Sequence, residues 1–308
     1  MRSDAVISIR DVTHYFGRRR VLDQVSLDVP RGSVFAFLGR NGSGKTTMIR
    51  IMLGLLEPTR GGTRVLGDDG RRISPETRAR IGYMSESHAL YDWMTVEQLG
   101  AYQATFYARW NQRIFDSVVG HFRLNRETKA GSLSRGERAG LSLAITLAPE
   151  PELLVLDDPA LGLDPVARRA LLESMLYVTR AADRTIFFSS HLLDDVERVA
   201  DHLAILDRSV LRASCSVDAF RSSISQFRLQ FAAGSVPPNL PPIRGMLHAR
   251  TATDALWLTI ARPDDETQRV LHSLGAPIVD EVPLNFADAL TGYLGERDVR
   301  GSFLGGVA

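Results

Sequence analysis

The sequence predicts an α/β fold built on a mostly parallel sheet. Two dense apolar runs, at residues 34–38 and 153–156, have the length and composition of buried strands, and a third follows at 185–189. Helical sequence precedes the second and the third run. Strands that alternate with helices usually pair in parallel, with the helices covering the faces of the sheet.

The elements before and between these strands differ in pattern. Residues 6–29 alternate apolar residues with charged and turn residues, which predicts short antiparallel strands. A helix is expected over Thr46–Leu56. Residues 72–150 are helical in pattern, with loops around Tyr83–Thr95.

The composition changes after about residue 215, and the stretch 236–242 is rich in proline. Short strand-like pieces and two helical pieces accompany it, which indicates a small α+β domain. We therefore expect two domains, at residues 1–215 and 216–308. The expected strands lie at 227–231, 246–252 and 256–260, and the expected helices at 265–274 and 285–294.

The bulk composition is that of an ordinary globular protein, with 44% apolar and 24% charged residues. A formal net charge of +1 gives no strong field toward nucleic acid or acidic lipid. The single cysteine, Cys215, excludes an intrachain disulfide and fits a reducing compartment. No apolar run reaches the roughly 18 residues that span a bilayer, so we expect any action at a membrane to need a partner. Lysine occurs only at Lys45 and Lys129.

The most specific motif lies between the first buried strand and the following helix. Residues 39–47, GRNGSGKTT, fit the phosphate-loop pattern G-x-x-x-x-G-K-[ST]. Its backbone N–H groups and the helix N-terminus surround a polyphosphate, Lys45 reaches the β- and γ-phosphates, and Thr46 coordinates Mg²⁺. The residues expected to bind nucleotide are Gly39, Asn41, Gly42, Ser43, Gly44, Lys45, Thr46 and Thr47.

Two further motifs follow in the chain. Asp157 and Asp158 emerge at the carboxyl end of the strand 153–156, and Asp157 is the expected partner of Mg²⁺. Ser134 with Glu137 three residues later forms a capping box, which predicts that a helix begins here. A capped helix N-terminus is also a potential anion site.

Together these motifs resemble those of an ATP-binding cassette (ABC) ATPase over residues 5 to about 215. Each ordered element of that family has a counterpart in the chain: a phosphate loop, an LS-x-G signature, a Walker B strand, a D-loop and a switch histidine. They lie at residues 39–47, 133–136, 153–157, 161–164 and 191. The resemblance implies a P-loop NTPase core with an antiparallel β subdomain and a helical subdomain at about 87–150, followed by the small C-terminal accessory domain.

The resemblance also implies ATP and Mg²⁺ as cofactors and a head-to-tail dimer. Each ATP then lies between the phosphate loop of one subunit and Ser134, Gly136, Glu137 and the D-loop residue Asp164 of the other. Phe16 or Tyr15 matches the aromatic residue that stacks on adenine. The implied catalytic residues are Lys45, Glu86, Asp158 and His191, and the implied metal ligands are Thr46, Glu86 and Asp157.

Two positions depart from the family pattern. Asp158 stands where a glutamate usually polarises the attacking water, and its carboxylate lies about 1.5 Å further back. Asp158 either works slowly, marks a degenerate site as in asymmetric heterodimers, or leaves the water to another group. Glu86 stands where many members carry glutamine; it is either a metal or water contact or a surface residue without a role.

The expected function is that of an exporter-type transporter ATPase, cytoplasmic and held on the inner face of the membrane by a separate permease. Tyr91, Trp93 and Met94 form either a docking surface for that permease or part of the packing of the helical subdomain. Two other classes compete with this expectation. Soluble cassette ATPases of DNA repair or ribosome work typically contain two cassettes or long coiled coils, and this chain has one cassette and no long heptad run. Nucleotide kinases share the phosphate loop but do not explain residues 133–136 and 161–164. The C-terminal domain contacts its twin, regulates turnover, or caps the cassette passively. The sequence identifies neither the cargo nor whether the dimer is homomeric.

Overall fold

The structure, a computed structural model, describes residues 5–180, 184–191, 193–232, 240–252 and 255–294. It consists of two compact units, residues 1–214 and 215–308. The composition predicted the boundary between residues 215 and 216, one residue further along the chain. Each unit has its own sheets and its own apolar core, and the two are described separately below.

The first unit begins with an antiparallel sheet in the strand order β2-β1-β4-β5. The alternating N-terminal segment forms two long strands, whereas short strands were expected. Both bend at bulges, because Asp11 and Gln24 have φ angles of 47° and 48° where the register shifts. The strands are β1 (Ala5–Phe16), β2 (Arg19–Pro30), β4 (Arg60–Val65) and β5 (Asp68–Asp69).

The central sheet has the order β10-β9-β3-β8-β7-β6, and its pairs from β9 to β6 are parallel, which confirms the predicted fold class. Strand β6 was not expected, since it lies in the stretch read as helical sequence and loop. Four residues are too few to show a strand period. The strands are β3 (Val34–Leu38), β6 (Ile81–Met84), β7 (Leu153–Leu156), β8 (Thr185–Ser190), β9 (His202–Asp207) and β10 (Val210–Ser216).

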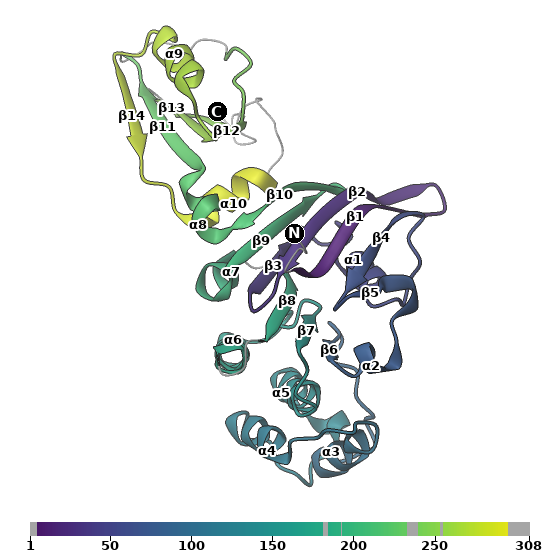
Figure 1. Cartoon of the computed structure of the whole chain (residues 1–308). Helices are drawn as coiled ribbons and strands as arrows, with labels where there is room; N and C mark the ends of the chain where they lie inside the picture. Colours follow the sequence, from purple (N-terminus) through teal and green to yellow (C-terminus); the bar gives the residue numbers. More distant parts are fainter. Residues whose placement is uncertain (1–4, 181–183, 192, 233–239, 253–254, 295–308) are drawn as a thin grey trace. The chain divides into compact units, whose positions relative to one another are not determined.

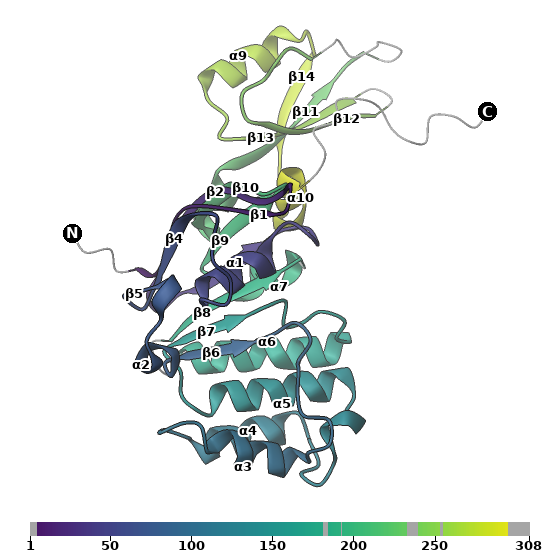
Figure 2. The same ribbon diagram turned by 90° about the vertical axis from the view of Figure 1, so that its right-hand side faces the viewer.

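Three helices of this unit form a separate helical group. Helices α3, α4 and α5 gather beyond β6 and β7, away from the antiparallel sheet (Figures 1 and 2). Helix α1 follows the glycine loop and ends at Met52, earlier than expected, because Gly54 turns the chain at φ 68°. The helices are α1 (Lys45–Met52), α2 (Pro75–Arg78), α3 (Val96–Ala104), α4 (Gln112–His121), α5 (Arg135–Leu147), α6 (Pro165–Arg180) and α7 (Leu193–Val199), with 3₁₀ turns at Gly70–Arg72 and Ala130–Ser132.

One apolar core joins the two sheets of the first unit. Ile7 and Ile9 of β1, Phe35 and Phe37 of β3, and Met48 of α1 belong to the same buried cluster. Burial of such side chains stabilises each by about 1.5–3 kcal/mol relative to exposure. Strand β3 and helix α1 are therefore anchored on both sides of the loop that connects them.

The second unit contains an antiparallel sheet of order β12-β13-β11-β14 with its own core, which includes Phe227, Leu258 and Leu271. Strand β14 was not expected: it is an edge strand of five residues with mostly exposed side chains, so its sequence carries little apolar signal. The elements are β11 (Ile224–Gln230), β12 (Met246–Ala252), β13 (Ala255–Ala261), β14 (Ile278–Val282), α8 (Val217–Ser222), α9 (Asp265–Ser273) and α10 (Phe286–Leu294). In the part of the chain that the structure describes, no helix of either unit is long and apolar enough to cross a bilayer.

Candidate functional site

The glycine loop connects β3 directly to the N-terminus of α1. Gly44 precedes the helix at φ 111°, and a Cβ there would lie 2.8 Å from the carbonyl oxygen of Val21. Only glycine combines that backbone conformation with such a close approach. The first N–H groups of α1 have no partner within the helix, so the loop and the helix end together present donors to an anion.

Lys45 is the first residue of α1, and its side chain turns back over the loop. Its Nζ donates to the carbonyl oxygens of Gly39 at 2.8 Å and Arg40 at 3.4 Å. Burial lowers the pKa of Lys45, while the carboxylates of Asp158 and Asp157 oppose that shift. The loop thus holds an ammonium group in place before any phosphate binds.

Asp157 and Asp158 follow β7 and are both buried, at 2% and 5% exposure. Asp157 Oδ1 accepts hydrogen bonds from Ser189 Oγ at 2.8 Å and from Thr46 Oγ1 at 3.2 Å. The Ser189 hydroxyl oxygen also accepts from the backbone N–H of Asp158 at 2.8 Å. One hydroxyl of β8 therefore holds both acidic residues.

Ser189 was not among the predicted site residues. Its signal in the sequence was weak, because a serine at the end of an apolar run is common and its spacing to Asp157 carries no motif. The side chain acquires its role only because β7 and β8 pair in parallel, with Leu156 opposite Phe188. The residues that follow each strand then meet at one edge of the sheet.

His191 and Asp158 form a direct pair. The Nδ1 atom of His191 lies 2.8 Å from Oδ2 and 3.2 Å from Oδ1 of the carboxylate. Asp158 adopts φ 44°, a left-handed backbone conformation that is uncommon for residues other than glycine, asparagine and aspartate. The pair gives the site a proton acceptor and a histidine that holds its orientation.

A pocket of about 450 Å³ opens in front of these groups. The Ser43 hydroxyl of the glycine loop is buried without a hydrogen-bond partner in the described structure, and Ser43 is not part of the pocket lining. We call this space the phosphate-loop pocket. Its lining comprises Phe16, Arg19, Val21, Asn41, Gly42, Gly44, Lys45, Thr46, Thr47, Glu86, Asp157 and Asp158.

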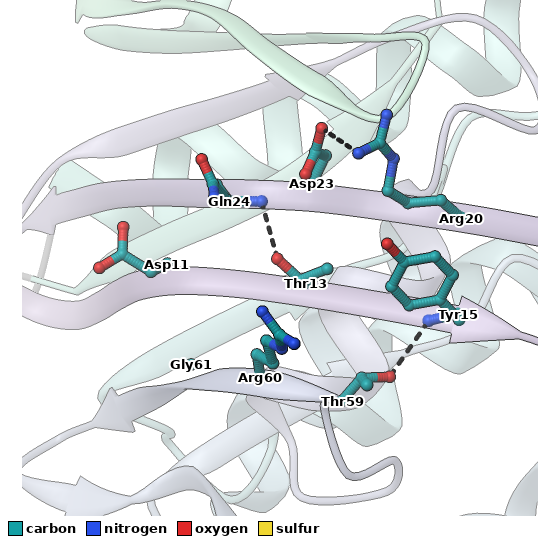
Figure 3. A pocket seen from close by; sticks show the side chains of 9 residues that line it. All are labelled: Asp11, Thr13, Tyr15, Arg20, Asp23, Gln24, Thr59, Arg60 and Gly61. Atoms are coloured by element: carbon teal, nitrogen blue, oxygen red, sulfur yellow. Dashed lines mark hydrogen bonds and ion pairs between the residues drawn. The ribbon is translucent and has the colours of Figure 1, made fainter.

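The two aromatic alternatives for adenine lie in different places. Phe16 is 52% exposed and lines the phosphate-loop pocket, where its ring is available for stacking. Tyr15, the preceding strand residue, lines a separate pocket of about 530 Å³ together with Thr59 and Arg60 (Figure 3). Successive strand residues point to opposite faces, so only one of the two lies beside the glycine loop.

The signature residues lie elsewhere on the first unit. Ser134 caps α5, with its Oγ accepting from the Glu137 N–H at 3.3 Å and its own N–H donating to Glu137 Oε2 at 2.8 Å. Gly136 allows α5 to approach α6 closely, since a Cβ there would lie 2.8 Å from the Cβ of Ala167. Asp164 caps α6 by accepting from the N–H of Ala167 at 3.1 Å. We call residues 134–136 the signature tip; none of them lines the phosphate-loop pocket of its own chain.

The loop between Glu86 and α3 carries a buried histidine. His88 is 2% exposed, and neither ring nitrogen has a hydrogen-bond partner in the described structure. Burial lowers the pKa of His88 to about 4, with Arg135 and Arg138 contributing. Glu86, by contrast, is exposed at the rim of the phosphate-loop pocket.

The three apolar residues of the same loop separate into two groups. Tyr91 and Trp93 are 47% and 65% exposed, and their rings contact each other in a tilted arrangement with centroids 6.2 Å apart. Met94 is 9% exposed, which agrees with the second of the two alternatives, packing inside the helical subdomain. The composition of the loop does not reveal which of its apolar side chains is buried.

Known proteins share this architecture. A family model described as ABC transporter matches residues 22–161, which contain the glycine loop, the signature tip and Asp157. The bacitracin transport ATP-binding protein BcrA of Bacillus licheniformis is 33% identical over 208 residues, covering 67% of this chain and 68% of that protein. The Nod factor export ATP-binding protein I of Cupriavidus metallidurans is 32% identical over 209 residues, covering 66% of this chain and 68% of that protein.

A solved structure of the ATP-binding subunit of an ABC transporter superposes with a TM-score of 0.63 at 30% identity, covering 70% of this chain and 92% of that one. Sequence similarity, fold and the position of the glycine loop thus agree. The chain belongs to the family of ABC transporter ATP-binding subunits and is an ATPase whose hydrolysis of ATP is coupled to transport.

Proposed function

We propose that two ABC subunits, at least one of them this chain, bind Mg-ATP between them and drive a separate permease in export. The observation that carries the proposal is the separation of two anion-binding features on one unit. The phosphate-loop pocket is lined by its own set of residues, and the signature tip is absent from that lining. A second subunit placed head to tail would bring a signature tip to each pocket.

The residues present fit a magnesium ion bound with the nucleotide. Thr46 Oγ1 and Asp157 Oδ1 lie 3.2 Å apart, and oxygen ligands of this type suit Mg²⁺. Among the described residues no cluster of three acidic or histidine side chains is available as a metal cage. Phosphate and water oxygens would therefore supply the other ligands, and the ion would neutralise phosphate charge.

Asp158 and His191 are the groups proposed to act on the attacking water. The Asp158 carboxylate accepts its proton, and His191 holds the carboxylate through the contact at 2.8 Å. Asp158 is one methylene shorter than the usual glutamate, and its carboxylate is turned toward His191. Slow hydrolysis, or a degenerate site within a heterodimer, follows from that shorter reach.

The permease is proposed to dock beside the helical subdomain. A pocket of about 440 Å³ there is lined by residues of β6, the following loop, α3 and α5, including Tyr83, Leu90, Tyr91 and Gln103. Next to it the exposed rings of Trp93 and Phe106, at 65% and 64%, provide apolar surface of the kind found at interfaces. The chain would then act on the inner face of the membrane, held there by the permease.

Export is favoured by the name of one relative, the Nod factor export ATP-binding protein I. Residues 215–308 are proposed as an accessory domain that contacts its twin or modulates turnover. Deletion of residues 223–308 would then change dimerisation or ATP turnover, and a truncated chain with both values unchanged would indicate a passive cap.

The two lysines of the chain provide the test of nucleotide binding. Lys45 is buried at the glycine loop and Lys129 is exposed on the helical subdomain. Lys45→Ala should abolish Mg-ATP binding and ATP-driven dimerisation, whereas Lys129→Ala should leave both unchanged. The measurement is fluorescent-nucleotide binding together with sedimentation of the full chain, followed by co-purification with its permease.

Magnesium-dependent ATP binding that survives Lys45→Ala would overturn the proposal. Isolation of the chain with DNA or ribosomes, and not with an integral membrane protein, would favour the soluble cassette ATPases.

A further inference from the structure

His14 is a buried histidine of β1 that no step of the proposed hydrolysis uses. Its side chain is 6% exposed, and neither ring nitrogen has a hydrogen-bond partner among the described residues. A neutral imidazole has one N–H donor and one acceptor nitrogen, and burial of such groups without partners is destabilising. The contacts that His14 makes are therefore those of its ring and not those of its nitrogens.

The ring of His14 lies against the ring of Phe16, two positions further along β1. The ring centroids are 4.7 Å apart, with an interplanar angle of 81°. A perpendicular arrangement at this distance is one of the two favoured geometries of aromatic pairs. Among the described residues no other aromatic ring contacts Phe16. Since His14 is buried and Phe16 is 52% exposed, the contact restricts an exposed ring by means of an enclosed one.

Phe16 occupies a place in the fold where few other neighbours restrain it. It is the last residue of β1, Gly17 turns the chain at φ 60°, and Phe16 pairs with Arg19 on the far side of the turn. Both Phe16 and Arg19 line the phosphate-loop pocket, whereas His14 does not. A ring at the tip of a hairpin loses rotamer freedom when a planar ligand stacks on it, and that loss weakens binding.

The strand pair that carries the two rings packs closely against the glycine loop. His14 pairs with Leu22 of β2. A Cβ on Gly44 would lie 2.9 Å from Leu22 Cδ2 and 2.8 Å from the carbonyl oxygen of Val21. Such dense packing leaves little room for relative movement. His14 is thus held in the part of the sheet that adjoins the loop, and the ring of Phe16 rests on it.

We propose that His14 is a positioning residue for nucleotide binding, whose ring holds Phe16 in the orientation that stacks on the adenine base. The inference rests on the proposed binding of Mg-ATP and adds a residue that does not itself touch the nucleotide. A ring that is oriented in advance reduces the ordering that stacking requires. His14 therefore strengthens only the part of the affinity that depends on the base, and the part that depends on Lys45 and the phosphates is independent of it.

The experiment compares two ligands of the full chain by calorimetry, with Asp158→Asn present to suppress hydrolysis. One ligand is Mg-ATP, and the other is Mg-tripolyphosphate, which has no base. His14→Leu keeps most of the volume without the ring and should weaken ATP binding by about fivefold. It should leave tripolyphosphate binding unchanged. His14→Phe keeps a ring and removes the unpaired nitrogens, so it should retain the ATP affinity of the parent.

Phe16→Ala and His202→Leu are the controls. In a chain that carries Phe16→Ala, the addition of His14→Leu should cause no further loss of ATP affinity, because His14 acts through that ring. His202 is a matched histidine of the same unit: its ring stacks with Phe35 at a centroid distance of 6.4 Å, and its Nδ1 is buried without a partner in the described structure. It does not line the phosphate-loop pocket, so His202→Leu should keep the parent ratio of ATP to tripolyphosphate affinity.

An equal loss of affinity for both ligands in His14→Leu would overturn the inference, because the change would then reflect a disturbed fold. Parent ATP affinity in His14→Leu would overturn it as well, and so would a loss in His14→Phe as large as that in His14→Leu. Parent ATP affinity in Phe16→Ala would show that Phe16 does not stack on the base, and the role of His14 would fall with it. The proposed binding of Mg-ATP is tested separately by Lys45→Ala and would stand in each of these cases.

Discussion

The phosphate-loop pocket and the signature tip belong to one unit and both suit anions, yet they are built in opposite ways. In the pocket Lys45, Asp157 and Asp158 are at most 7% exposed, and each is hydrogen-bonded to another part of the site. At the tip Ser134 and Arg135 are exposed, and the arginine charge has no counter-ion in the described chain. The charged side chains of the pocket are held by hydrogen bonds within the unit, whereas the guanidinium of Arg135 at the tip has none among the described residues. In the proposed dimer, the tip would meet its ligand only when a second subunit is present.

The largest expected effect concerns His88, which lies within the electrostatic influence of the signature helix. Its pKa of about 4 lies below the value near 6.5 in an unfolded chain, so the folded state favours the neutral ring. Stability is complete above pH 6.5 and falls as the pH drops toward 4, by up to about 3 kcal/mol. Denaturant unfolding of the metal-free chain across this range measures the loss.

His88→Leu should flatten the profile, and replacement of the exposed His121 by glutamine is the control for histidine loss in general. Parallel profiles for the parent and His88→Leu would show that the buried ring does not stay neutral.

A second prediction tests the internal order of the pocket. Ser189→Ala leaves the Asp158 N–H without its acceptor and Asp157 with one donor fewer. A displacement of either carboxylate by about 1 Å should lower ATP turnover on the order of 100-fold. Ser33→Ala, which removes a buried hydroxyl bonded to the Pro30 carbonyl outside the pocket, should affect stability alone. Equal turnover for the two variants would contradict the role of Ser189 in holding both aspartates.

A third prediction separates the alternatives for Asp158. Asp158→Glu extends the carboxylate toward the pocket and should raise turnover roughly tenfold. Asp158→Asn should abolish whatever turnover the parent shows, if the carboxylate acts on the water. Loss of turnover in Asp158→Glu, or full turnover in Asp158→Asn, would indicate that a different group orders the water.

The smallest expected effect concerns the cap of the signature helix. Ser134→Ala and Thr95→Ala each remove the hydroxyl of a capping box, at α5 and α3. Each should cost about 1 kcal/mol of stability. ATP-driven dimerisation should weaken only in Ser134→Ala, as measured by sedimentation. An equal shift in both variants would mean that the Ser134 hydroxyl serves the helix and not the nucleotide.

Several elements could be predicted because their signal is local. Gly44 indicates a left-handed backbone conformation, and Ser134 with Glu137 indicates the start of a helix. Strand β3 is a continuous apolar run. Strand β6 and the edge strand β14 had no such signal, since one is four residues long and the other is mostly exposed.

The sequence alone determined the family, the phosphate loop, Asp157 and the helix start at Ser134, because each depends on residues close together along the chain. Only the tertiary structure decided which aromatic faces the pocket, that Met94 is buried, that Ser189 links both aspartates and that Arg135 rests against Gly162. Those outcomes depend on strand pairing and helix packing between segments far apart in the chain. The spacing of residues along the sequence does not determine which faces of these distant segments pack against each other.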